Sequence, residues 1–384
     1  MHSHKFLDSL PQPDAKVEPK TDLEGLIRGL IDEGAGWIDF ARFMSTALYE
    51  PKWGYYSSQN RQIGGKPSLG SDFVTAPELT PAFGRALGNS VAQALIQTQT
   101  DEIWEFGPGT GALAFQLLDY LGDKVKKYTL VDVSGELRAR QSATLEVYKD
   151  KVSWVSELPP HMQGVLIGNE VLDAIPVNIL KRISGTWFEQ GVSYSNLSDS
   201  ASAPSDSFTW AFKETSLRPP TEDGLVGDYL TEIHPQAQAF ISTLVKKFSK
   251  GAFFFIDYGF PEREYYHPQR HMGTIMCHFR HTADDNPLVL VGHKDITAHV
   301  NFTAVALAAQ EAGAEVLGYT SQAHFLINSG LLEGLDRADR EQRAAALKLI
   351  NEHEMGELFK VLVLGVGVSF DPLGCQRGDR THTL

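Results

Sequence analysis

The chain has 384 residues, which allows roughly two to three domains at about 150 residues each, or one large domain with insertions. Hydrophobic residues make up 42% and charged residues 21% of it, so the chain is not disordered throughout. The net charge of −14 argues against a general nucleic-acid binder, because a phosphate backbone would be repelled.

The N-terminus and the cysteines bear on where the protein works. Residues 1–21 lack the apolar segment of a signal peptide and carry acidic residues that a mitochondrial transit peptide avoids, so we expect a disordered polar tail. Cys277 and Cys375 are too few for a disulfide framework, which favours a reducing compartment. No uncharged apolar run reaches the about 18 residues of a membrane span. These features predict a cytoplasmic protein of bacterial type without membrane insertion, and they disfavour the mitochondrial matrix.

Residues 22–100 are predicted to form a helical N-terminal cap. Apolar residues over 23–31 recur on one face of a helix. A Thr-Pro pair at 80–81 is a typical start of a second helix. A loop rich in glycine and tyrosine, residues 50–78, separates the two helices.

Strands and helices alternate over residues 101–370, which predicts an α/β domain built on a parallel, doubly wound sheet with helices on both faces. An antiparallel final strand would also fit. The polar residues 371–384 fit no element and form a tail. The expected strands are 103–106, 128–132, 152–155, 165–167, 252–256, 316–319 and 360–366. The expected helices are 111–121, 135–147, 235–248, 302–312 and 338–350.

Two insertions interrupt the alternation, at about 184–215 and 258–301. The first reads as strands around a mobile, serine-rich tip. The second is rich in Tyr, His, Arg and Pro, and so long a segment without regular structure is uncommon unless it is functional. Its histidines could be taken for a zinc site, but no cysteine pair supports one, so we predict no metal and favour a lid or a substrate contact. Aromatic residues such as Tyr55 and Tyr56 could line a groove for a peptide or simply pack the insertion against the N-terminal helices.

A glycine loop follows the first expected strand and opens a helix. Residues 103–111 read IWEFGPGTG, in which Gly107, Gly109 and Gly111 allow sharp turns and leave room for a ligand against the main chain. The helix that follows presents free N–H groups. Asp132 ends the next strand, where a carboxylate can accept hydrogen bonds from ribose hydroxyls. This pattern predicts a ligand that contains a nucleoside.

The spacing of the glycines bears on which nucleoside is bound. The loop reads G-x-G-x-G, one residue shorter than the dinucleotide fingerprint, and there is no P-loop. Glu105 would repel a pyrophosphate but suits a cationic ligand such as S-adenosylmethionine (SAM). An NAD site, or a tight turn without a ligand, stays open as an alternative. The residues assigned to the cofactor are Glu105, Gly107, Pro108, Gly109, Gly111, Asp132, Val133, Ser134, Asn169 and Glu170.

A second cluster lies in residues 166–177, LIGNEVLDAIPV. Its apolar strand ends in Asn169 and Glu170, with Asp173 just beyond. Ligands of open α/β sheets lie off the carboxyl ends of the strands, so these side chains would face the crevice of the glycine loop. The alternative is that Asn169 or Asp173 caps a short turn.

The ordered chain, roughly residues 23–367, resembles the MidA-type methyltransferases, the family of the mitochondrial complex I assembly-factor protein arginine methyltransferase. The resemblance rests on eight segments in order: residues 43–51 (FMSTALYEP), 54–56 (GYY), 70–78 (GSDFVTAPE), 105–111 (EFGPGTG), 168–177 (GNEVLDAIPV), 256–259 (IDYG), 273–276 (GTIM) and 295–302 (DITAHVNF). It implies SAM as the methyl donor and a Rossmann-like class I methyltransferase sheet with a helical N-terminal segment and two insertions. It also implies that Asp72, Phe73 and Thr75 cover the cofactor.

The resemblance predicts a SAM-dependent protein arginine N-methyltransferase that acts on a respiratory complex I-type subunit. A guanidinium keeps its charge at neutral pH, so its methylation needs carboxylates that orient it and accept a proton. Glu170 is the first catalytic candidate, with Asp173 and Asp257 behind it. A small-molecule methyltransferase and a SAM-binding assembly chaperone without essential catalysis are the alternatives, and an oligomer is compatible with all three.

Overall fold

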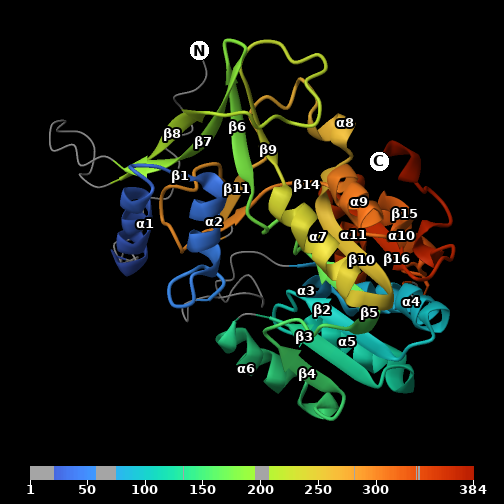
Figure 1. Cartoon of the computed structure of the whole chain (residues 1–384). Helices are drawn as coiled ribbons and strands as arrows, with labels where there is room; N and C mark the ends of the chain where they lie inside the picture. The colour runs from blue at the N-terminus through green and yellow to red at the C-terminus, as the bar shows by residue number, and fades with distance from the viewer. Residues whose placement is uncertain are drawn as a thin grey trace.

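The computed structural model describes residues 21–57, 75–132, 134–194, 207–280, 282–333, 335 and 338–384. Its largest sheet confirms the predicted α/β fold (Figure 1). The strand order is β15 (Glu315–Ser321), β16 (Phe359–Val366), β10 (Phe248–Phe260), β5 (Met162–Asn169), β2 (Glu102–Phe106), β3 (Lys127–Val131) and β4 (Val152–Val155), with the short β14 (Val300–Asn301) beside β10.

The strand directions also agree with the prediction of a parallel sheet that allowed an antiparallel final strand. Strands β4, β3, β2, β5 and β10 are parallel, whereas β16 runs antiparallel to both β10 and β15. The antiparallel final strand is therefore present. This strand lies between β15 and β10, which both come earlier in the chain. Its position depends on which strands pair with each other, and hydrophobic periodicity carries no information on pairing.

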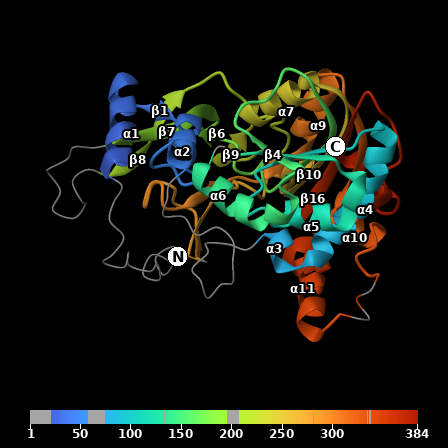
Figure 2. The same cartoon turned by 90° about the horizontal axis from the view of Figure 1, so that it is seen from below.

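Helices cover both faces of this sheet (Figure 2). Along β10, Phe254 and Ile256 contribute to one hydrophobic core, and Phe253 and Phe255 contribute to the other, as the two-residue period of a strand requires. The first core is closed by α4 (Pro81–Thr98), α5 (Ala112–Leu121), α10 (Gln322–Asn328) and α11 (Arg340–Ile350), and the second by α7 (Pro235–Lys247) and α9 (Phe302–Glu311).

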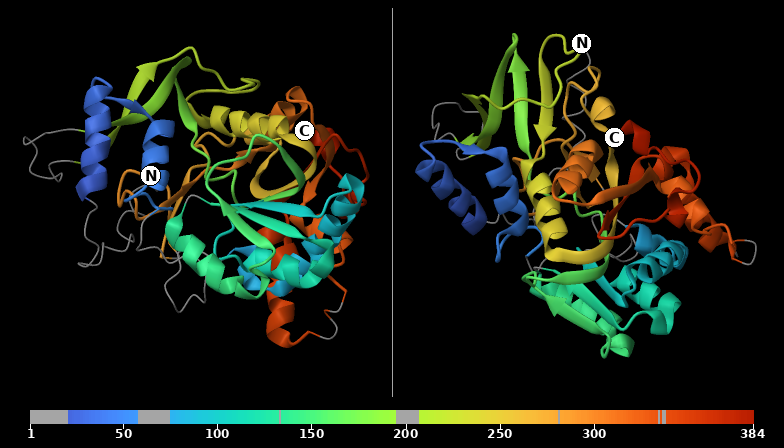
Figure 3. Two further views of the ribbon diagram at one scale, coloured as in Figure 1. Left: turned by 60° about the horizontal axis from the view of Figure 1, so that its bottom comes forward. Right: turned by 45° about the vertical axis from the view of Figure 1, so that its right-hand side comes forward.

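The insertions and the first helices form a second lobe (Figure 3). It contains a five-stranded sheet of β1 (Ile38–Asp39), β6 (Asn178–Ile183), β7 (Thr186–Tyr194), β8 (Phe208–Glu214) and β9 (Tyr229–Ile233), and a three-stranded sheet of β11 (Met276–Phe279), β12 (Thr282–Asp284) and β13 (Asp295–Thr297). Helices α1 (Thr21–Glu33) and α2 (Phe40–Tyr49) contact β7, and they share one apolar core with both sheets. The 258–301 insertion, whose second half carries the three-stranded sheet, also holds the short α8 (Glu262–Tyr265) and is thus largely structured.

The predicted cap is not one packing unit in the structure, although its boundary at residue 100 stays a prediction. Helix α4 starts where expected, with the Thr80 hydroxyl accepting a hydrogen bond from the Ala82 amide, but it packs on α5 and the central sheet. The short α3 (Ala76–Leu79) precedes it, and α6 (Gly135–Thr144) follows β3. Of the expected serine-rich tip, which runs from Ser193 to Ser207, residues 195–206 lie outside the described residues.

Residues 371–384, expected to form no element, fold against the central sheet. They contain 3-10 turns at Leu373–Cys375 and Thr381–Thr383. The Arg380 guanidinium donates to both carboxylate oxygens of Glu357, at 2.5 and 3.1 Å. Among the described residues, no helix is both long enough and apolar enough to span a bilayer.

Candidate active site

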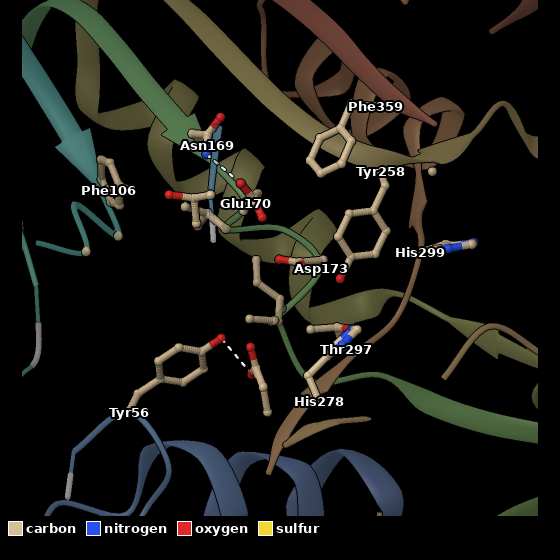
Figure 4. A pocket seen from close by; sticks show the side chains of 18 of the residues that line it. Tyr56, Phe106, Asn169, Glu170, Asp173, Tyr258, His278, Thr297, His299 and Phe359 are labelled. Carbon is tan, nitrogen blue, oxygen red and sulfur yellow. Dashed lines mark hydrogen bonds between the residues drawn. The ribbon is translucent and has the colours of Figure 1, made fainter. Parts of the chain in front are cut away.

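A cavity of about 890 Å³ opens at the carboxyl ends of β2, β5 and β10, between the two lobes (Figure 4). Its size suits a ligand of a few hundred daltons, since such pockets span roughly 300–1,000 Å³. One end is walled by the glycine loop and β3, and the other by the second lobe. Among the described residues the polar and charged side chains on its wall are Tyr49, Tyr56, Thr75, Asp132, Asn169, Glu170, Asp173, Gln236, Tyr258, His278, Asp295, Thr297 and His299.

The glycine loop has the backbone that a ligand-binding turn requires. Gly107, Gly109 and Gly111 have φ of +59°, +53° and +84°, a region in which side chains other than glycine are strained. Apart from its chain neighbours, no atom of the described residues lies within 4 Å of a Cβ built at Gly109, although this residue lies on the cavity wall. The loop therefore leaves open space at the cavity, which fits a bound cofactor. Gly111 lies off the wall and begins α5 as its N-cap.

Asp132 joins the loop to α6 on the same wall. Its two carboxylate oxygens accept hydrogen bonds from the Ser134 amide at 2.8 Å and from the Gln141 side-chain amide at 2.6 Å. The same Gln141 nitrogen donates to the Gly109 carbonyl at 2.9 Å. Asp132 is thereby oriented toward a ligand held by the loop. Gln141 is fully buried in the middle of α6, and no pattern in the sequence singles it out.

We expect Asp132→Ala to weaken the binding of S-adenosylhomocysteine by about 10- to 100-fold, because a carboxylate hydrogen-bonded to a ligand contributes roughly 1.5–3 kcal/mol. Calorimetric titration measures this. Ser134→Ala is the control, because Ser134 caps α6 through the Leu137 amide but does not line the cavity. It should lower the melting temperature and leave the affinity unchanged. Equal affinities for wild type and Asp132→Ala would remove Asp132 from the cofactor site.

Of the remaining residues that were predicted to bind the cofactor, some line the cavity and others do not. Glu105 is buried behind the wall, where it accepts a 2.6 Å hydrogen bond from the Tyr128 hydroxyl. Burial raises the pKa of Glu105 to about 7, and the charge of Asp132 adds to this. Pro108 and Ser134 also lie off the wall, and Thr75 lies on it. Asp72, Phe73 and Val133 are outside the described residues, so their assignment stays a prediction.

Asn169 ends β5, Glu170 follows it, and both side chains line the cavity. The Asn169 side-chain amide donates to the Glu170 carboxyl at 3.1 Å, and its own oxygen is buried without a hydrogen-bond partner. Glu170 has a φ of +54°, a strained conformation for a residue with a side chain. Burial, together with the charge of Asp173, raises the pKa of Glu170 to about 8. Strain and a displaced pKa at one cavity residue are typical of a catalytic position.

Asp257 supports this turn from behind. One oxygen accepts hydrogen bonds from the successive amides of Val171, Leu172 and Asp173, at 3.1, 2.9 and 3.3 Å, and the other accepts from the Tyr258 amide at 2.9 Å. Asp257 does not reach the cavity. Of the three predicted catalytic acids, the structure brings Glu170 and Asp173 to the wall and places Asp257 where it positions them.

Asp173 lies between Glu170 and the second lobe, as Figure 4 shows. It is 5% exposed, and its Oδ1 has no hydrogen-bond partner. Burial raises its pKa to about 7, opposed by a hydrogen bond with the Tyr258 side chain and reinforced by the charge of Asp295. Burial and the nearby charge of Asp173 also raise the pKa of Tyr258, so its hydroxyl keeps its proton.

The second lobe also lines the cavity, with residues that the sequence analysis named only as possible contacts, such as Tyr56, or did not name, such as Asp295. Asp295 of β13 accepts a 2.8 Å hydrogen bond from the Tyr56 hydroxyl, and both lie on the wall. Of the histidines of the 258–301 insertion, His278 and His299 line the cavity, and burial lowers the pKa of His299 to about 4. Among the described residues, no three His, Cys, Asp or Glu side chains are grouped to hold a metal. Asp295 and His299 both belong to segment 295–302, one of the segments on which the family resemblance rests. That membership was the sequence signal that could have identified them as site residues.

Strand order and a glycine-lined cavity at the carboxyl ends of the strands define a Rossmann-like class I methyltransferase. The model of the family described as "Putative S-adenosyl-L-methionine-dependent methyltransferase" matches residues 86–320, more than half of the chain, so the chain belongs to that family. It is a SAM-dependent methyltransferase, and the predicted resemblance to the MidA-type enzymes is confirmed.

Known proteins similar to the chain agree with this. A superfamily member from Burkholderia thailandensis, whose crystal structure was determined bound to S-adenosyl-homocysteine, is 42% identical, with a TM-score of 0.90 over 98% of this chain and 99% of its own. The human mitochondrial protein arginine methyltransferase NDUFAF7 is 28% identical over 86% of this chain and 81% of its own. Its homolog in Caenorhabditis elegans is 26% identical over 86% and 83%.

Proposed function

We propose that this methyltransferase acts on arginine side chains of a protein. The observation that carries the proposal is the charge of the acceptor end of the cavity. Glu170, Asp173 and Asp295 line it, whereas none of the described residues on the wall is a lysine or an arginine. Such a wall suits a cation with several N–H donors, and a guanidinium is a cation of this kind. The names of the human and nematode relatives support the same acceptor.

The site residues can then be given roles in the reaction. Bound SAM supplies an electrophilic methyl group on a sulfonium; Gly109, Asp132 and Asn169 would hold it. As a nitrogen–carbon bond replaces the carbon–sulfur bond, the guanidinium gives up one N–H proton and keeps its single positive charge. Glu170 orients the reacting nitrogen and takes this proton. The hydrogen bonds of Asp257 hold the turn that carries Glu170.

The raised pKa values predict the pH dependence. An acid with a pKa near 8 is mostly protonated at pH 6, and a neutral Glu170 neither binds a guanidinium as an anion nor accepts its proton. We therefore expect kcat/KM for an arginine acceptor to rise about tenfold per pH unit below that pKa and to level off above it. Initial rates between pH 6 and 9.5 measure this. A flat profile would contradict the role of Glu170 as the base.

The acceptor can be identified with SAM that carries an isotopically labelled methyl group. Purified enzyme is incubated with proteins from cells that lack it, and peptide mass spectrometry locates the label. We expect label on arginine. Label only in small molecules would replace this proposal with a small-molecule methyltransferase, and cofactor binding without any transfer would replace it with a chaperone. A complex I-type subunit as acceptor, and a cytoplasmic location, stay predictions that the same experiment and cell fractionation address.

A further inference from the structure

The wall opposite Glu170 is built from parts of the chain that are distant in sequence. Tyr56 follows α2, and Asp295 begins β13; the two residues are 239 positions apart, yet they are joined by a 2.8 Å hydrogen bond. Asp295 is 3% exposed. Tyr56 stacks on Tyr49 with ring centroids 5.3 Å apart, and the Tyr49 hydroxyl donates to the Ala174 carbonyl at 2.9 Å. Asp295 is therefore held in one orientation by a packed aromatic pair.

This carboxylate faces the same space as the predicted catalytic acids. Asp295, Asp173 and Glu170 all line one cavity, and the charge of Asp295 acts on both of the others, since it raises the pKa of each. In Figure 4, Glu170 lies in the upper part of the view and Tyr56 in the lower part, with Asp173 to one side at an intermediate height. The acids thus surround a space rather than form one row along a strand.

An unsatisfied acceptor points to a ligand in that space. Asp173 is 95% buried, and its Oδ1, on a side chain that lines the cavity, has no hydrogen-bond partner. A buried acceptor left in this state destabilises the protein unless a donor reaches it. Donors offered to Glu170, Asp173 and Asp295 from one central position must point outward in several directions. A planar guanidinium does this with five N–H groups, whereas an ammonium offers three from a single nitrogen.

We propose that Asp295, held by Tyr56, binds the non-reacting terminal nitrogen of the acceptor guanidinium and selects arginine over lysine. The inference rests on the proposed function, because it assumes that the acceptor is a guanidinium. Glu170 then orients the reacting nitrogen from one side and Asp295 the other nitrogen from the opposite side. Asp295 is a positioning residue, and the proton still passes to Glu170.

The test measures binding rather than turnover. Wild-type enzyme saturated with S-adenosylhomocysteine is titrated calorimetrically with n-butylguanidinium and with n-butylammonium, which share one alkyl chain. We expect Asp295→Asn to raise the dissociation constant of n-butylguanidinium about tenfold or more, as loss of a charged hydrogen bond does, and to change n-butylammonium binding much less. Tyr56→Phe keeps the ring and frees Asp295 to turn, so it should weaken n-butylguanidinium binding about two- to tenfold.

The matched control is Asp285→Asn, an exposed aspartate of the same insertion, which should leave all affinities unchanged. Wild-type affinity for n-butylguanidinium in both Asp295→Asn and Tyr56→Phe would overturn the inference and leave the proposed function intact. No binding of n-butylguanidinium to the wild type would overturn arginine as the acceptor, and the inference with it. Unchanged affinity for S-adenosylhomocysteine shows that the variants are folded.

Discussion

Glu170→Gln should lower kcat for methyl transfer by on the order of 100- to 10,000-fold, which is the usual contribution of a general base. The amide keeps the size of the side chain and its contact with Asn169, but it accepts no proton and carries no charge. The dissociation constant of S-adenosylhomocysteine should stay within a few-fold of wild type. Single-turnover methylation and calorimetry measure the two effects separately. Glu311→Gln, at an exposed residue of α9, is the control and should match the wild type.

The same substitution should stabilise the protein at alkaline pH. The pKa of Glu170 is raised from 4.5 to about 8 in the folded protein, so between these values the folded state holds more protons than the unfolded state. Its stability therefore falls as the pH rises through this range. Glu170→Gln removes this loss, which is on the order of 5 kcal/mol at pH 9. A higher melting temperature together with lost turnover would identify Glu170 as a residue retained for chemistry. Unchanged turnover would exclude it from the mechanism.

Gly109→Leu should weaken S-adenosylhomocysteine binding by about 100-fold. The leucine side chain would overlap the bound ligand, and such overpacking costs about 3 kcal/mol. The side chain would project from the loop into the space that is open at the cavity wall. Methyl transfer at low SAM concentration should fall in parallel. Fluorescence or calorimetric titration of the purified variant measures the affinity.

The strain of the backbone must be separated from the loss of space. Gly109 has a φ of +53°, so any side chain there also adds roughly 1–2 kcal/mol of local strain. Gly185, in the turn between β6 and β7, has a φ of +86° and equally open surroundings, but it is remote from the cavity wall. Gly185→Leu should destabilise the protein by a similar amount and bind the ligand normally. Equal binding by both variants would mean that Gly109 does not face the cofactor.

The local signals of the sequence determined most elements of the fold and the glycine-loop end of the cavity. The α4 start at residues 80–81, the glycine loop and Asp132 are each defined by neighbours within a few residues. Their hydrogen bonds confirm the capped helix and the oriented carboxylate. Helix α10 and strand β9 were missed, because each is short and carries a weak pattern.

The tertiary structure alone decided where the predicted acids lie relative to the cavity. Asp257 and Glu170 each come after an apolar run in the sequence, and nothing local tells which of them faces the cavity. The backbone amides that donate hydrogen bonds to Asp257 lie 84 to 86 residues earlier, and they hold its carboxylate away from the cavity.

Gln141 and the pair of Tyr56 and Asp295 show the same limit. Gln141 is an ordinary polar residue of a helix until α6 packs beside the glycine loop. Tyr56 meets Asp295 because the first helices and the insertion share one core. Local sequence therefore determined the glycine loop, whose geometry comes from backbone conformation over a few residues. The acceptor end was decided by packing between segments up to 239 residues apart, which no short pattern encodes.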